Sequence, residues 1–320
     1  MTAAPRTDDP AHAGLVAALA PFLAAEELPA RLAQLTGERS TALRVNRLCA
    51  ESPSVTEELA GAGLQAEPVP WCPDALLLPP GSQRAVQTTD AHAAGKVYVQ
   101  GLSSQVAPLA LAPESGMRVL DLCAAPGSKT SQLAALLGGG DGLHANERSR
   151  TRIHRLRSVL NQLGVTGVTL SSRPGQSFGR THPAAFDAVL VDAPCSMEGR
   201  LRIGDPHAAD PTPRGRIRRL AGEQRALLSA AVTACAPGGV IVYATCTLAV
   251  EENERVLDKL LRRRSDDVQL EALPVDVPDA LPGRTVHGER PMHPDLIHAR
   301  RLLPDATREG FFIARLRRLG

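Results

Sequence analysis

The sequence lacks the long apolar run that a membrane-spanning helix needs, since no stretch approaches roughly 18 residues. The N-terminus has no basic start followed by an apolar segment, so we expect no signal peptide. The six cysteines form no C-x-x-C pair and show no metal-ligand spacing, which predicts no metal site. Free thiols need a reducing compartment, so we expect a cytoplasmic protein.

Lysine is also scarce. The chain of 320 residues contains three lysines, Lys96, Lys129 and Lys259, against thirty-three arginines. Because arginine supplies positive charge almost everywhere else, the lysine at position 129 indicates that an ammonium group is specifically needed there.

The net charge of +2 is close to neutral, but the basic residues are clustered at 148–157, 214–219 and 262–264. Basic clusters on a near-neutral chain are typical of a nucleic-acid-binding surface. We favour a solvated helix face for 262–264. We expect Arg214–Arg219, in a loop rich in proline and glycine, to contact RNA phosphates.

Strand and helix patterns alternate from about residue 96 onward, which predicts an α/β domain over 96–320 with a mostly parallel sheet covered by helices. Residues 1–95 are expected to form a separate, small N-terminal α+β domain that begins with a disordered tail to about residue 12. The strands are expected near 118–122, 141–146, 165–171, 186–192, 239–244, 268–273 and 310–316. The helices of the larger domain are expected near 102–111, 129–137, 149–163, 220–236 and 250–264.

Residues 117–130 read as a strand, a loop of small residues and a helix that begins near Ser128. Small residues let the backbone approach a ligand, and a helix N-terminus offers unpaired N–H groups. The glycines of a P-loop or of G-x-G-x-x-G are missing. The next strand ends at Glu147, some 20 residues after the loop, where nucleotide-binding sheets place the acceptor for ribose hydroxyls. The pattern therefore predicts a site for a nucleoside-like cofactor.

Two cysteines follow two further strands: Cys195 comes three residues after Asp192, and Cys246 comes two residues after the strand at 239–244. Ligands of open parallel sheets bind beyond the carboxyl ends of the strands. Two thiols at that edge, one of them near a carboxylate, indicate covalent chemistry, and from the residues alone either thiol can be the nucleophile. The alternative for both is burial as a small apolar side chain.

Several motifs occur in a fixed order, and together they resemble the Sun-type RNA cytosine-5 methyltransferases from about residue 40 to the C-terminus. The motifs at 69–72 and 244–254 are particularly similar to those of the bacterial RsmF-type ribosomal RNA enzymes. The resemblance implies a Rossmann-like S-adenosylmethionine-dependent methyltransferase sheet and an N-terminal domain that helps to bind RNA. The motifs are RVNRL (44–48), VPWC (69–72), DLCAAPGSKT (121–130), DAPCS (192–196), ATCTL (244–248), EENE (251–254) and EGFFIAR (309–315).

The resemblance also implies roles for the site residues. Carbon-5 of cytosine attacks a methyl donor only after a thiolate has added to carbon-6, and the resemblance assigns this addition to Cys246. It assigns breakdown of the adduct to Cys195 and contact with nitrogen-3 or the exocyclic amine to Asp192, while Lys129 would favour a thiolate nearby. The implied cofactor-binding residues are Cys123, Ala124, Ala125, Pro126, Gly127, Ser128, Lys129, Glu147 and Asp192.

The chain departs from the family pattern at two positions. Pro174 stands where an aspartate usually accepts from the adenine amine, and we expect Gln176 to substitute. Met197 stands where glycine is usual, and we expect it to narrow the pocket for the target base.

The expected substrate is 16S ribosomal RNA, and the expected state is a monomer. Relatives often carry a C-terminal RNA-binding module, whereas this sequence ends about where the sheet does, which makes a transfer-RNA methyltransferase the second hypothesis. A non-catalytic RNA-binding assembly factor is the third, because Pro174 weakens the cofactor site.

Overall fold

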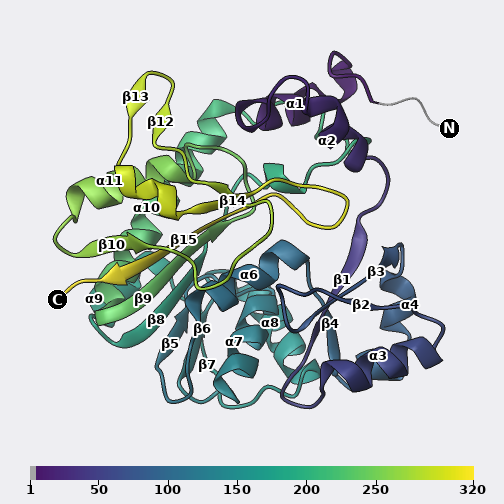
Figure 1. Ribbon diagram of the computed structural model, residues 1–320. Helices are drawn as coiled ribbons and strands as arrows, with labels where there is room; N and C mark the ends of the chain where they lie inside the picture. Colours follow the sequence, from purple (N-terminus) through teal and green to yellow (C-terminus); the bar gives the residue numbers. More distant parts are fainter. Residues whose placement is uncertain (1–4) are drawn as a thin grey trace.

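The computed structural model describes residues 5–320 and is centred on a nine-stranded sheet (Figure 1). Eight strands follow the order β11-β14-β15-β9-β8-β5-β6-β7, and the ninth, β10, pairs with β15. A run of parallel strands forms one side of it: β5 (Val119–Asp121), β6 (Leu143–Asn146), β7 (Thr169–Ser171), β8 (Phe186–Asp192) and β9 (Cys235–Thr245). The other side is antiparallel and contains β10 (Val268–Glu271), β11 (Leu281–Pro282), β14 (Arg300–Leu302) and β15 (Phe311–Arg318). The predicted α/β fold is confirmed, whereas β11 and β14 were not predicted.

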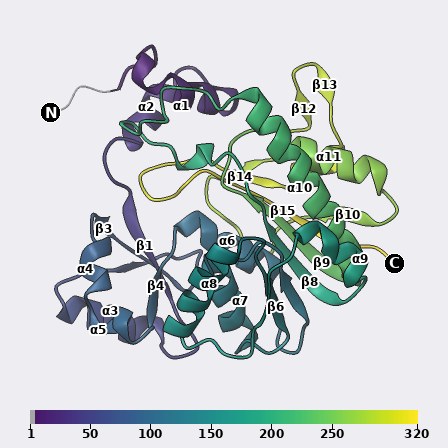
Figure 2. The same ribbon diagram turned by 180° about the vertical axis from the view of Figure 1, so that it is seen from behind.

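Helices cover both faces of this sheet (Figures 1 and 2). Successive side chains of a strand point to opposite faces: Val189 and Val191 pack toward one layer of helices, and Ala188 and Leu190 pack toward the other. Burial on both faces explains the continuous apolar runs in the sequence. The first layer contains α9 (Phe178–Thr181), α10 (Arg214–Ala234) and α11 (Glu254–Arg263), and the second contains α6 (Leu102–Leu111), α7 (Ser128–Leu137) and α8 (Arg150–Gln162).

A second, four-stranded sheet precedes the large one, with strand order β2-β3-β1-β4. Buried Arg44 of β1 joins it to the rest of the molecule: its Nε donates to Gln100 Oε1 (2.8 Å), and its Nη2 donates to Ser131 Oγ in α7 (2.7 Å). The small sheet is therefore tied to the helix that follows the small-residue loop. Its elements are β1 (Ser40–Val45), β2 (Glu67–Pro68), β3 (Ala75–Pro80), β4 (Val97–Val99), α3 (Ser52–Gly61), α4 (Gln83–Gln87) and α5 (Asp90–Ala93).

The first helices, α1 (Ala13–Leu19) and α2 (Leu28–Gln34), lie apart from the small sheet in both views (Figures 1 and 2). Their leucines pack instead against Ala208, Leu248 and Leu303. The expected domain boundary near residue 95 stays a prediction. The expected tail falls partly on residues 1–4, which lie outside the described residues. It is wrong at residues 10–12, which form a 3-10 helix whose His12 is buried.

The prediction of a loop at Arg214–Arg219 is also wrong, because α10 begins at Arg214. Pro213 directly precedes this helix, and proline at a helix start has a φ angle that suits the first turn and no N–H to leave unpaired.

A short hairpin of β12 (Val286–His287) and β13 (Arg290–Pro291) follows the sheet's β11. Within residues 5–320, no helix combines the length and the apolar character that crossing a membrane requires.

A fully buried ion pair joins β14 to α11. Arg301 Nη2 lies 2.5 Å from Glu254 Oε2, and Arg301 Nη1 donates to the carbonyl of Leu248 (2.8 Å). The guanidinium carbon also lies 4.1 Å from the centre of the Phe22 ring, so the N-terminal segment packs on the same cation.

Glu254→Gln should therefore lower the free energy of unfolding by about 3 kcal/mol, because it leaves the Arg301 charge buried and unpaired. Denaturant titration measures this loss. Asp267→Asn is the matched control, since Asp267 pairs with Arg264 (2.6 Å) near the surface and should cost less than about 1 kcal/mol. Equal losses in the two variants would contradict the prediction.

Candidate active site

The small-residue loop connects β5 to α7 and is fixed by its backbone. Gly127 has φ +111°, a conformation that strains any residue with a side chain, and a Cβ there would lie only 3.0 Å from Leu156 Cδ1 in α8. The Ala124 N–H donates to the carbonyl of Asn146 at the end of β6 (2.8 Å). The loop is thus held against α8 and the neighbouring strand.

Asp121 lies buried beneath this loop. Its Oδ2 accepts a hydrogen bond from Thr130 Oγ1 (2.7 Å), whereas its Oδ1 has no partner within residues 5–320. Burial raises the pKa of Asp121 to about 7.

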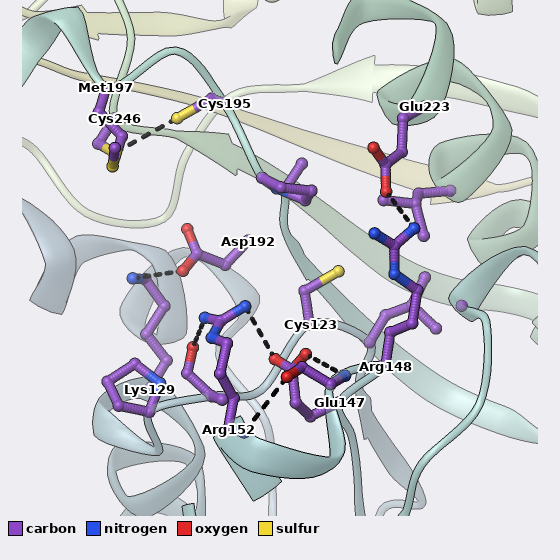
Figure 3. Close-up of a pocket in the computed structure, with 18 of the residues that line it drawn as sticks. Cys123, Lys129, Glu147, Arg148, Arg152, Asp192, Cys195, Met197, Glu223 and Cys246 are labelled. Atoms are coloured by element: carbon purple, nitrogen blue, oxygen red, sulfur yellow. Dashed lines mark hydrogen bonds and ion pairs between the residues drawn. The ribbon is translucent and has the colours of Figure 1, made fainter. Parts of the chain in front are cut away.

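Glu147 lies beside the loop, at the end of β6. Its Oε1 accepts from the Ser149 N–H (2.8 Å), and its Oε2 pairs with Arg152 Nη1 (3.1 Å). Arg152 Nη2 also donates to the carbonyl of Ala125 (2.5 Å), so the arginine clamps the loop to the carboxylate (Figure 3).

The two cysteines meet at the carboxyl ends of β8 and β9, where Asp192 pairs in register with Ala244. The Sγ atoms of Cys195 and Cys246 lie 3.3 Å apart (Figure 3). The hydrogen bond to Cys246, together with burial, raises the pKa of Cys195 well above its ordinary value. The raised pKa favours the protonated thiol at Cys195, and Cys246 is the more exposed of the two cysteines.

Lys129 and Asp192 form a second pair beside the thiols, with Nζ 2.8 Å from Oδ2. Burial disfavours the ammonium, but the attraction of Asp192 outweighs it and raises the pKa of Lys129. Lys129 and Cys246 line the same cavity. The site thus holds a buried cation, fixed by Asp192, beside the two thiols.

These groups surround one cavity of about 670 Å³. It brings together all but two of the residues predicted for the site. Ala124 and Gly127 support the loop instead of lining the cavity. The predicted residues that line it are Cys123, Ala125, Pro126, Ser128, Lys129, Glu147, Asp192, Cys195 and Cys246.

A buried polar network behind the thiols was not predicted. Glu252 Oε2 accepts from the Ser196 N–H (3.1 Å) and from Gln224 Nε2 (2.8 Å), and burial raises the pKa of this carboxyl. Asn253 Nδ2 donates to the carbonyl of Thr247 (2.9 Å). The EENE motif was the available signal, and its middle residues hold the loops of both cysteines.

Further cavity residues were not predicted, among them Phe311, Arg200 and Glu309. Lys129 Nζ lies 5.5 Å from the centre of the buried Phe311 ring, and Arg200 Nε donates to Glu309 Oε1 (3.3 Å). The EGFFIAR motif, which starts at Glu309, was the signal for two of them.

The two departures from the family pattern occupy different places. Gln176 lines the cavity, whereas Pro174 is exposed and precedes the 3-10 helix Gly175–Ser177. Met197 lines the cavity beside the two cysteines, in a left-handed backbone conformation that costs a non-glycine residue about 1 kcal/mol.

Comparison with known proteins identifies this arrangement. A sequence model of the 16S rRNA methyltransferase RsmB/F family matches residues 108–317, about two thirds of the chain. The chain belongs to the RsmB/F family. The match contains the small-residue loop, both cysteines and the EENE motif.

Individual relatives agree with this assignment. Ribosomal RNA small subunit methyltransferase F of Serratia proteamaculans is 37% identical over 279 residues, which are 86% of this chain and 56% of the relative. The enzyme of the same name from Cronobacter sakazakii is 36% identical over 280 residues, with the same coverage. The chain spans about half the length of these curated relatives.

A solved structure is similar along the whole chain. The crystal structure of a methyltransferase homolog protein from Pyrococcus horikoshii is 31% identical, has a TM-score of 0.77 and covers 95% of this chain and 99% of its own. The family resemblance and the fold class predicted from the motifs are confirmed. The roles of the individual site residues stay predictions.

Buried Asp121 should make stability depend on pH. Its folded pKa of about 7 exceeds the unfolded value of about 3.9, so the folded protein holds an extra proton between these values. The free energy of unfolding of wild type relative to Asp121→Asn should therefore fall as the pH rises from 4 to 7, by at most about 1.4 kcal/mol per pH unit. Denaturant titrations across this range measure the difference.

Asp187→Asn is the control, because the hydrogen bond from Arg118 lowers the pKa of Asp187. Its contribution should have the opposite sign and disappear as the pH falls below about 4. A wild-type advantage over Asp121→Asn that does not change with pH would contradict the assignment.

Lys129→Met should slow the reaction of Cys246 with iodoacetamide at pH 7 about tenfold, because it removes the cation that favours the thiolate. Mass spectrometry of the Cys246 peptide measures the rate. Lys259→Met, which removes an exposed lysine of α11, should leave the rate unchanged. Unaltered alkylation in Lys129→Met would show that the cation does not act on this thiol.

Proposed function

We propose that this protein is an S-adenosylmethionine-dependent RNA (cytosine-5) methyltransferase that acts on 16S ribosomal RNA through a covalent Cys246 adduct. The observation that carries the proposal is the pair of thiols 3.3 Å apart beside the Lys129–Asp192 ion pair. A purely structural pair of cysteines needs neither a cavity nor a buried cation next to it.

The cofactor half of the cavity suits S-adenosylmethionine. The cavity volume of about 670 Å³ lies within the usual range for small-molecule sites. The Glu147 carboxylate is a suitable acceptor for ribose hydroxyls, and the Gln176 amide is a suitable partner for adenine. When bound, S-adenosylmethionine supplies the electrophilic methyl group.

The first step is the addition of the Cys246 sulfur to carbon-6 of cytosine, which turns carbon-5 into a nucleophile. Lys129 stabilises the attacking thiolate by its charge, and the Cys195 thiol stabilises it by its hydrogen bond. Asp192, held by Lys129, accepts a hydrogen bond from the exocyclic amine and so orients the ring.

The second step takes the proton from the methylated carbon-5 and releases Cys246. A solvent base accepts this proton, the electron pair of the C–H bond forms the carbon-5–carbon-6 double bond, and the Cys246–carbon-6 bond breaks so that Cys246 leaves as a thiolate. Cys195 is adjacent to Cys246 and assists by a hydrogen bond to the leaving sulfur. Each cysteine therefore has a separate role, and removing one should not give the same result as removing the other.

The names of the relatives support ribosomal RNA as the substrate, and the basic residues Arg148, Arg200 and Arg219 at the cavity support an RNA partner. The monomeric state is part of the proposal. Catalytic thiols support a location in the reducing cytoplasm. A transfer-RNA substrate or a non-catalytic RNA-binding factor are the competing outcomes of the test below.

The test incubates wild type, Cys246→Ala and Cys195→Ala with labelled S-adenosylmethionine and either small-subunit ribosomal RNA or transfer RNA. We expect 5-methylcytosine in ribosomal RNA from wild type only. Cys246→Ala should lose both product and adduct, whereas Cys195→Ala should accumulate a protein–RNA adduct that survives denaturation. Gel electrophoresis detects the adduct, and nucleoside analysis detects the product.

Cys235→Ala is the matched control, since Cys235 is buried in the core on β9, and it should keep wild-type chemistry. If the label appears in transfer RNA alone, transfer RNA replaces ribosomal RNA as the proposed substrate. RNA binding without any methyl transfer would favour the assembly factor.

A further inference from the structure

Met197 combines two features that are unusual for a bulky apolar residue. Its backbone has φ +66° and ψ +21°, a left-handed conformation that side chains with a Cβ rarely adopt. Its side chain is 45% exposed and lines the catalytic cavity, next to Cys246 in Figure 3. The other exposed large apolar side chains, Val286 and Ile297, lie outside this cavity.

The neighbouring contacts impose this conformation. Before Met197, the Ser196 N–H donates to Glu252 Oε2 (3.1 Å), and the Ser196 hydroxyl bonds to Thr247 Oγ1 (2.6 Å). After it, the Gly199 N–H donates to the carbonyl of Cys246 (3.1 Å). Because both sides are anchored to the loop of Cys246, the left-handed turn is required at position 197, and glycine would satisfy it without strain.

Since the backbone favours glycine and nearly half of the Met197 side chain stays exposed, burial alone is a weak reason for a methionine here. The chemistry of the cavity gives a reason for the methionine. A cytosine that enters the site leaves its stack and loses apolar contact with its neighbours, and the enzyme must replace that contact. Phe311 is buried in the cavity wall, so it offers only one fixed surface. A thioether is polarisable and adaptable, which suits it to cover an entering ring.

We propose that Met197 is a positioning residue for the target base: its side chain covers the pyrimidine turned into the cavity and holds it beside Cys246. The inference rests on the proposed function and adds to it the residue that retains the base. It distinguishes Met197 from the surrounding loop residues, whose hydrogen bonds hold the protein itself.

The test compares wild type with Met197→Gly, Met197→Leu and Ala184→Gly. Ala184 is the matched control, because it is exposed and also left-handed (φ +51°) but lies away from the cavity, between α9 and β8. Steady-state methylation of small-subunit ribosomal RNA or transfer RNA gives kcat and KM for RNA and for S-adenosylmethionine, and calorimetry gives Tm.

Met197→Gly should lower kcat/KM for RNA about tenfold, which corresponds to one lost contact, with KM for S-adenosylmethionine unchanged. Its Tm should equal or exceed that of wild type, as should the Tm of Ala184→Gly, because both substitutions relieve a left-handed residue. Met197→Leu should restore kcat/KM to within about threefold of wild type, since it keeps an apolar cover of similar size. Ala184→Gly should keep wild-type kinetics.

Wild-type kcat/KM in Met197→Gly, with an active wild type, would overturn this inference alone. A clear fall in its Tm would also overturn it, because the methionine would then be structural. If wild type transfers no methyl group to either RNA, the proposed function and this inference both fail.

Discussion

The parallel pairing of β8 with β9 is the constraint on which the site depends. Asp192 lies opposite Ala244 in this ladder, and the two cysteines follow within three residues on each strand. A slip of one residue would turn every side chain of a strand to its opposite face. The apolar layers on both sides of the sheet prevent this, since Val191 and Leu190 are fully buried in opposite layers. The 3.3 Å contact between the thiols is thus a consequence of core packing.

The polar supports of the site are concentrated in one short segment. Glu252 holds the loop after Cys195, Asn253 holds the loop after Cys246, and Glu254 pairs with Arg301 of β14. Three consecutive side chains therefore connect both cysteine loops with the antiparallel side of the sheet. Because these contacts share one backbone segment, the effects of substituting them should not be additive.

The sequence predicted the parts of the fold whose residues have a clear period or composition. The apolar strands and the helices between them lie within a few residues of the predicted ranges. β14 was missed because Arg300 and Arg301 do not read as a buried strand, although Arg301 is fully buried by its ion pair with Glu254. The start of α10 was missed because proline and arginine at 211–219 resemble a loop.

At the site, the sequence predicted which strands carry the two cysteines, because the carboxyl ends of parallel strands share one edge. It did not predict that Cys195 is buried while Cys246 is partly exposed, since that depends on how the loops after the two strands pack. It also did not predict Phe311 in the cavity wall, because β15 reaches β9 from the far end of the chain and only the antiparallel pairing brings it there.

The Arg44 side chain links the position of the small sheet to that of the small-residue loop. It spans from β1 to Gln100 and to Ser131, three residues into α7, through hydrogen bonds of 2.8 and 2.7 Å. A hydrogen bond weakens when its donor–acceptor distance grows by a few tenths of an ångström. The two bonds of Arg44 therefore hold β1 and α7 at a nearly fixed separation. A displacement of the small sheet is therefore transmitted to the N-terminus of α7. A contact that fixes the small sheet would also restrict the motion of the loop from Cys123 to Ser128.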